Sequence, residues 1–262
     1  MIAAAVLAAA NVWAQLPAED YLNQYVRQVR NVGYAGVGVE TILDRWAVAY
    51  PNDINMLTGR FNYYFAKSQS TQVVAKGNLR TFMGNKPVMS LKDSTGATVN
   101  YFEEYFFDDE YFAAASKALD KAISLEPENI DLRFNKISSL IAYEKESPDM
   151  TEAEIMKMID SPFGGEQFPD IIQEYCGLVY SVGSPRAYEV FRAVSERMSG
   201  LYPRNTNFIT NLGTCAMVAD KNWRKAIKIY DKALKINPSD EVALKNKAIA
   251  EKMLKASKTK KK

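Results

Sequence analysis

The chain has 262 residues, 47% of them hydrophobic and 24% charged, a composition typical of a folded protein with a sizeable core. It contains no histidine, so acid–base chemistry or metal binding by imidazole is excluded. Its formal net charge is +2, but residues 221–262 hold 14 basic and 4 acidic side chains, whereas residues 1–220 hold 19 basic and 27 acidic ones.

The first fourteen residues are predicted to be a signal peptide. The apolar run from Ile2 to Ala10 is too short to span a bilayer. Within Val12-Trp13-Ala14, Val12 and Ala14 stand at the two positions that a signal peptidase reads, which suits cleavage before Gln15. An ordinary N-terminal helix is the alternative. We therefore expect an exported protein whose mature chain has no transmembrane segment.

One short phrase then occurs four times. In each copy an acidic residue is followed directly by a basic one. A proline stands six positions after the basic residue, and an Asp or Asn stands two positions after the proline. The copies begin at Asp44, Asp120, Glu196 and Asp231, and their prolines Pro51, Pro127, Pro203 and Pro238 are 76, 76 and 35 positions apart. Such self-similarity indicates stacked repeats, each too small to bury its apolar face alone.

Each phrase predicts the end of one helix and the start of the next. Apolar residues precede each proline at helical spacing, and proline cannot continue a helix. The residue two positions later has a side chain that caps a helix N-terminus, namely Asp53, Asn129, Asn205 and Asp240. The new helices are predicted over 54–68, 130–145, 206–219 and 241–256.

Two copies carry a small, a large and a small residue at twelve, eight and five positions before the proline: Ala115, Leu119 and Ala122 before Pro127, and Ala226, Tyr230 and Ala233 before Pro238. With Asn211-Leu212-Gly213 ahead of the last copy, this pattern resembles the tetratricopeptide repeat (TPR), over about two thirds of the chain. The copies ending at Pro51 and Pro203 depart from it. The resemblance implies an all-α fold, a TPR-like α-α superhelix forming a right-handed solenoid. An Ala-Gln junction with such repeats also resembles exported TPR proteins of Bacteroidetes-type bacteria, which implies a periplasmic or secreted location.

The unequal spacing of the prolines predicts two insertions. Residues 15–69, 109–145 and 185–257 are expected to form TPR-like helices, the last with a capping helix. Residues 70–108 contain alternating apolar residues around Asp93-Ser94-Thr95-Gly96, which predicts a β-hairpin. Residues 146–184 are predicted to be a helical insertion, and residues 258–262 a solvated basic tail.

Candidate ligand-binding side chains lie on the helices that follow the prolines. The resemblance implies that these helices line a concave groove, where Asn and Lys side chains hydrogen-bond a peptide backbone or carboxylate. The residues concerned are Asn62, Tyr63, Lys67, Asn135, Lys136, Asn207 and Asn211. The alternative is that they belong to an ordinary solvated face.

The stretch from Tyr101 to Phe112 combines aromatic and acidic residues, which are typical of glycan sites. The alternative is that its rings pack the hairpin onto the repeats while Asp108 or Asp109 caps the next helix.

No catalytic residue, metal site or cofactor site is recognisable, and no nucleic-acid partner is expected. Cys176 and Cys215 are too few for a disulfide framework or a zinc site. They are expected to be buried free thiols, with one disulfide as the alternative. The favoured function is a non-enzymatic protein–protein interaction scaffold that binds a protein or peptide partner through the concave groove and the two insertions, or that self-associates. The alternative is a glycan-binding or glycan-handling protein that uses the aromatic and acidic residues 101–112.

Overall fold

The structure is a computed structural model that describes residues 16–82 and 85–259. The chain forms two compact units, one combining residues up to Ser70 with Phe107–Leu125, the other combining Thr71–Phe106 with the chain from Glu126 onward. The predicted signal peptide lies outside the described residues, as do the last three lysines of the predicted tail.

The described part of the first unit is mainly helical, with α3 packed most extensively against α4 and α2 packed against both α1 and α3. Its core lies around the fully buried Trp46, whose indole ring is approached by the rings of Tyr21 and Tyr25. Its helices are α1 (Ala18–Val32), α2 (Val39–Ala49), α3 (Ile54–Ser68) and α4 (Asp109–Leu125).

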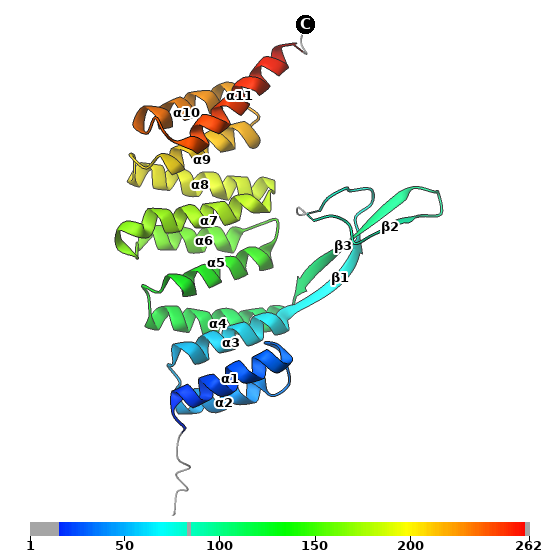
Figure 1. The fold of residues 1–262 in the computed structure, drawn as a ribbon, viewed down its shortest axis with the longest axis vertical. Helices are drawn as coiled ribbons and strands as arrows, with labels where there is room; N and C mark the ends of the chain where they lie inside the picture. The colour runs from blue at the N-terminus through cyan, green and yellow to red at the C-terminus, as the bar shows by residue number, and fades with distance from the viewer. Residues whose placement is uncertain (1–15, 83–84, 260–262) are drawn as a thin grey trace, which may run out of the picture. The chain divides into compact units, whose positions relative to one another are not determined.

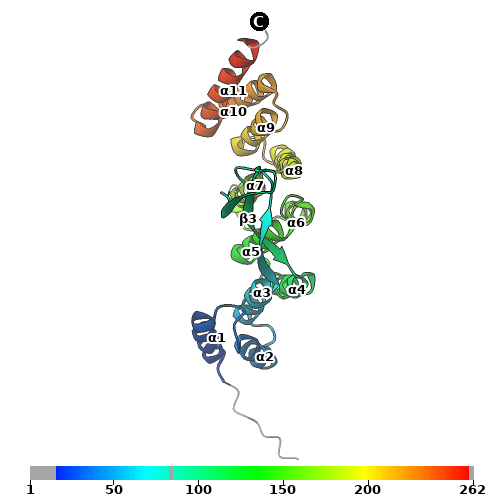
Figure 2. The same ribbon diagram turned by 90° about the vertical axis from the view of Figure 1, so that its right-hand side faces the viewer.

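In the second unit, seven further helices follow one another along the array (Figure 1). Seen from the side, α5 and α7 lie on one side of this array and α6 and α8 on the other (Figure 2). A short 3-10 helix, Gly165–Gln167, precedes α7. The helices are α5 (Ile130–Glu144), α6 (Asp149–Asp160), α7 (Phe168–Val182), α8 (Pro185–Leu201), α9 (Thr206–Val218), α10 (Trp223–Ile236) and α11 (Glu241–Thr259).

All four predicted caps are confirmed. The side chain of Asp53 accepts a hydrogen bond from the Met56 N–H at 3.0 Å, and that of Asn129 accepts one from Leu132 at 3.2 Å. Asn205 and Asp240 accept from the second and third residues of their own helices. The predicted helix starts are therefore correct, because the cap is a local interaction of neighbouring residues.

The predicted hairpin is also confirmed, within a sheet that has one more strand. Strand β2 (Met89–Lys92) pairs antiparallel with β3 (Thr98–Phe107), with Leu91 opposite Val99. The Asp93 carboxylate accepts from the N–H groups of Thr95 and Ala97 and closes the turn. The third strand, β1 (Gln69–Ala75), lies on the other side of β3 and was not predicted, since its first four residues are polar.

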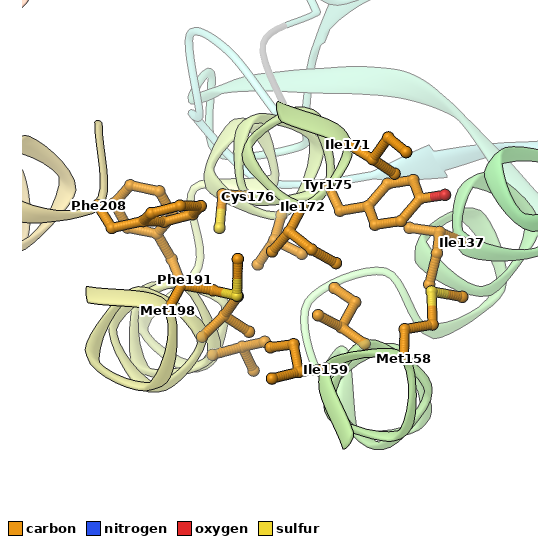
Figure 3. Packing of buried hydrophobic residues seen from close by; sticks show 14 of the residues in the cluster. Ile137, Met158, Ile159, Ile171, Ile172, Tyr175, Cys176, Phe191, Met198 and Phe208 are labelled. Carbon is orange, nitrogen blue, oxygen red and sulfur yellow. The ribbon is translucent and has the colours of Figure 1, made fainter. Parts of the chain in front are cut away.

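The segment 146–184 holds α6 and α7, and both pack within the array. Helix α6 contacts α5 and α8, and α7 contacts the same two helices. Apolar residues from α5 to α9 share one buried cluster, in which Ile159 and Ile172 are central (Figure 3). These helices therefore continue the stack, because their apolar faces complete a core that α5 and α8 leave open.

Both cysteines are buried and free. Cys176 points into the cluster from α7 (Figure 3). Burial raises the pKa of the Cys176 thiol to about 12 and that of Cys215 to about 11.

The order and packing of these elements make the described chain an all-α protein of TPR-like helix pairs with a small β-sheet.

Candidate functional site

Tyr63 and Lys67, two of the predicted ligand-binding residues, lie at the C-terminal end of α3 in a polar and aromatic cluster. The Glu40 carboxylate accepts hydrogen bonds from the hydroxyls of Tyr63, at 2.9 Å, and Tyr64, at 3.4 Å. The Lys67 ammonium donates to the Tyr63 hydroxyl at 3.1 Å and lies 4.7 Å from the centroid of the Tyr111 ring. Hydrogen bonding to Tyr63 and Tyr111 raises the pKa of Lys67, so this ammonium is charged and held by its own neighbours.

The other predicted residues are placed differently. Asn62 is half-buried on α3, and Asn135 is half-buried on α5. The Lys136 ammonium is 3.6 Å from a carboxylate oxygen of Glu154 on α6, which ties two helices together. Asn207 is exposed in the first turn of α9.

Asn211 is a structural residue. Only 7% of its surface is exposed, and its side-chain amide donates to the Gln173 side-chain oxygen Oε1 at 2.9 Å and to the Ser195 hydroxyl at 3.2 Å. It therefore joins α9 to α7 and α8. The seven predicted residues divide between the two units, and the structure brings Tyr63 and Lys67 into direct contact with each other.

A hollow in the first unit was not predicted from the sequence. It has a volume of about 410 Å³ and lies over α3, between α2 and α4. We call it the α2–α4 groove. It is lined by Ala47, Pro51, Met56, Leu57, Arg60, Tyr64, Ala114, Lys117, Ala118 and Lys121.

The lining has an apolar floor and a basic rim. Met56 and Leu57 are buried at the floor, and three cations, Arg60, Lys117 and Lys121, line the hollow without a carboxylate among the lining residues. The spacing of residues on α4 is the one sequence pattern that relates to this hollow. Ala114 and Ala118 are four residues apart, as are Lys117 and Lys121, so the two pairs form adjacent rows along the helix. That pattern does not reveal which helix faces the rows.

The aromatic and acidic stretch from Tyr101 to Phe112 is mostly engaged in packing. Phe102 and Phe112 are buried, and the Asp108 carboxylate accepts from the Tyr111 N–H, which makes it the cap of α4. Glu104 is bound by two ammonium groups, Lys145 at 2.8 Å and Lys76 at 2.9 Å. These lysines lower the pKa of Glu104, Lys145 more than Lys76, and so keep it ionised.

One face of the sheet carries exposed apolar side chains. Residues two apart on a strand share a face, and the register of β2 on β3 places Met89 opposite Tyr101 and Leu91 opposite Val99. Met89 and Leu91 are exposed, as is Tyr105, which follows on the same face of β3 with 55% of its surface accessible. We call these five residues the sheet face.

In residues 16–82 and 85–259, no group of His, Cys, Asp and Glu side chains is arranged to hold a metal ion. No helix in the same residues is both long and apolar enough to cross a membrane.

Solved structures similar to this chain include those of two other proteins. One is the crystal structure of YrrB, described as a TPR protein with an unusual peptide-binding site; it has 15% identity and a TM-score of 0.40, with 88% of this chain and 92% of YrrB covered. The other is yeast Tom70, with 10% identity and a TM-score of 0.40, with 92% of this chain covered and 40% of Tom70. No protein-family model and no curated protein matches the chain.

Proposed function

We propose that this protein is a non-enzymatic scaffold that binds a protein or peptide partner, and that it acts after export, in the periplasm or outside the cell. The sheet face is the observation that carries the protein-binding proposal. Exposed apolar side chains that gather on one face are costly in water and mark surfaces that another protein covers. Met89, Leu91 and Tyr105 are three such side chains on one face of the small sheet, where the exposed Glu103 lies between Tyr101 and Tyr105.

The opposite face of the sheet is tied to a helix end. Glu104 lies on the opposite face of β3, and its ion pair with Lys145 ties the sheet to the end of α5. The Lys145 ammonium also lies 4.4 Å from the centroid of the Phe106 ring. A surface that is anchored in this way limits the ordering entropy that binding would otherwise cost.

The glycan alternative has weaker support. A glycan platform needs several exposed rings, and Tyr105 is the one ring of the described 101–112 stretch that is clearly exposed. Glu104 is also unsuited to act as a general acid, because its lysine partners lower its pKa. We therefore favour a protein partner.

Crosslinking of the mature chain, residues 15–262, to an extract of its source envelope, followed by mass spectrometry, tests the binding proposal. We expect one or a few proteins crosslinked near the sheet face. Changing Met89 and Leu91 together to Ser should abolish capture, whereas Lys92→Ser, at the end of the same strand, should not. Capture of no protein by a correctly folded chain would overturn the scaffold proposal.

A second variant tests the residues expected from the sequence. Joint replacement of Asn62, Lys67 and Asn135 by Ala should weaken capture if the helices that follow the prolines contribute. Unchanged capture would remove them from the binding surface. Export is tested separately, by cell fractionation and N-terminal sequencing. We expect mature protein that begins at Gln15, and an uncleaved cytoplasmic chain would overturn that part.

A further inference from the structure

We propose that the α2–α4 groove binds a peptide segment in which a large apolar side chain stands next to carboxylates. This inference rests on the proposed function, since it names the kind of partner a binding scaffold would take. It adds a second binding surface, distinct from the sheet face and from the seven residues expected from the sequence.

The groove has room for an inserted side chain. Ala47 on α2 and Ala114 and Ala118 on α4 leave the space open, because their side chains end at Cβ. Ligand pockets commonly have volumes of about 300–1,000 Å³, so a hollow of about 410 Å³ accommodates a side chain of the size of Leu, Met or Phe. Such a side chain would contact the apolar atoms of Met56 and Leu57. The removal of its apolar surface from water would favour binding.

The charges around the groove select carboxylates beside that side chain. Arg60 is paired with Asp44 through one nitrogen, Nη2, at 2.6 Å, so one of the three cations is neutralised inside the protein. The Lys121 ammonium donates to the Pro51 carbonyl oxygen at 2.6 Å, a neutral acceptor that leaves its charge uncompensated. Lys117 is exposed and has no ion-pair partner in the part of the chain that the structure describes.

Two ammonium groups available to a carboxylate thus stand one helical turn apart at the rim. Lys117 and Lys121 are spaced four residues apart on α4, which places both on one side of the hollow. Carboxylates flanking an inserted side chain would pair with them. A polyanion without an apolar side chain would leave the floor unfilled, so the floor and the rim together favour a peptide over a nucleic acid.

Selection from a random peptide library displayed on phage, with the full chain as bait, tests the site even while the natural partner is unidentified. We expect enriched peptides in which Leu, Met, Phe or Trp neighbours Asp or Glu. The affinity of the selected peptides is then measured by fluorescence anisotropy for the parent chain and four variants, whose folding is checked by circular dichroism.

Two variants alter the groove and two are matched controls. Ala114→Leu fills the hollow, whereas Ala113→Leu adds the same atoms at an exposed neighbour outside the lining. Lys117→Glu reverses a rim charge, whereas Lys235→Glu reverses an exposed charge on α10. We expect both groove variants to weaken binding roughly tenfold or more, which corresponds to about 1.4 kcal/mol, and both controls to bind like the parent.

The outcomes separate this site from the general function. Enriched peptides that lack carboxylates, or that bind Lys117→Glu as tightly as the parent, would overturn the acidic-peptide site and leave the scaffold proposal standing. Failure to enrich any peptide would overturn the site too, while the crosslinking experiment decides the scaffold proposal independently. Because Lys117 is an exposed surface residue, its variant stays informative even if Ala114→Leu does not fold.

Discussion

Gly213 on α9 lies directly against the ring of Tyr230 on α10. A Cβ atom at position 213 would stand 2.7 Å from Tyr230 Cδ1 and nearer still to Cε1. The ring is fully buried, so it has little room to move. These two helices thus approach so closely that only glycine fits at position 213. The resemblance to the tetratricopeptide repeat led us to expect a small residue near 213 and a large one at 230.

Gly213→Ala should therefore destabilise the protein. An added methyl group in a packed core forces side chains or backbone to shift, at a cost of about 1–3 kcal/mol. Urea unfolding followed by circular dichroism measures the change in the free energy of unfolding. Gly177→Ala is the matched control, because Gly177 lies within α7 with nothing within 4 Å of its added Cβ. It should stabilise the helix by about 0.5–1 kcal/mol. Equal effects from both substitutions would contradict the close approach.

Glu104→Gln should loosen the sheet from α5. The substitution removes the charge that Lys145 and Lys76 bind, and only 13% of the Glu104 side chain is exposed, so the loss should be about 2 kcal/mol. Unfolding by urea gives the loss in stability, and amide hydrogen exchange should show faster exchange in β3.

This effect should depend on pH with a definite sign. The pKa of Glu104 is lowered in the folded protein, so its contribution to stability is present above the pKa of the unfolded carboxyl and is lost as the pH falls through the folded pKa. The difference between the parent and Glu104→Gln should be largest near neutral pH and vanish in acid. A difference that stays constant into acid would show that the ion pairs are not its cause.

The two buried thiols should react slowly and make the protein sensitive to alkali. Folding raises the pKa of Cys176 from 9.0 to about 12 and that of Cys215 to about 11, because burial disfavours the thiolate. The thiols ionise at a lower pH in the unfolded chain than in the folded one. The contribution of the buried neutral thiols to the free energy of unfolding is therefore complete below about pH 9. It falls as the pH rises toward the folded pKa values.

Reaction with a disulfide reagent at pH 8 measures the first part of this prediction. Two thiols should react at once in guanidinium chloride and only at the rate of opening in the native protein. The free energy of unfolding should decrease steadily above pH 9. Rapid native reaction of both thiols would contradict their burial.

Asn211 and Asn207 should separate structural from surface roles. Asn211→Ala removes three hydrogen bonds, two exchanged with the Gln173 side chain and one to Ser195, and should cost about 1–3 kcal/mol because it leaves partly buried polar groups unpaired. Asn207→Ala changes an exposed side chain four residues earlier and should alter stability by less than about 0.5 kcal/mol. Thermal unfolding of the two variants tests this, and similar losses would mean that Asn207 is also structural.

Much of the fold could be predicted because its signals are local. Pro51 and Asp53 end one helix and begin the next through interactions within a few residues, and the same holds at the other three phrases. The turn at Asp93 is equally local, since one carboxylate accepts from backbone groups two and four positions later. The free, buried state of both cysteines also agrees with the first of the two alternatives expected.

The partners of the candidate site could not be predicted in the same way. Helical spacing places Asn207 and Asn211 on one face of α9, but only the packing of α7 and α8 decides that Asn211 is enclosed. The helices of 146–184 were expected, whereas their place in the stack depends on which apolar faces meet.

The sequence by itself therefore determined where the helices begin and end, where the hairpin turns, and that small and large residues alternate as in TPR-like repeats, because capping, proline sterics and periodicity act over a few residues. Only the tertiary structure decided that α2 and α4 leave a hollow over α3, that Lys117 and Lys121 stand at its rim, and that Glu104 is held by Lys145. These relationships join residues that are distant in the chain, and they depend on how whole helices pack, which no local pattern specifies.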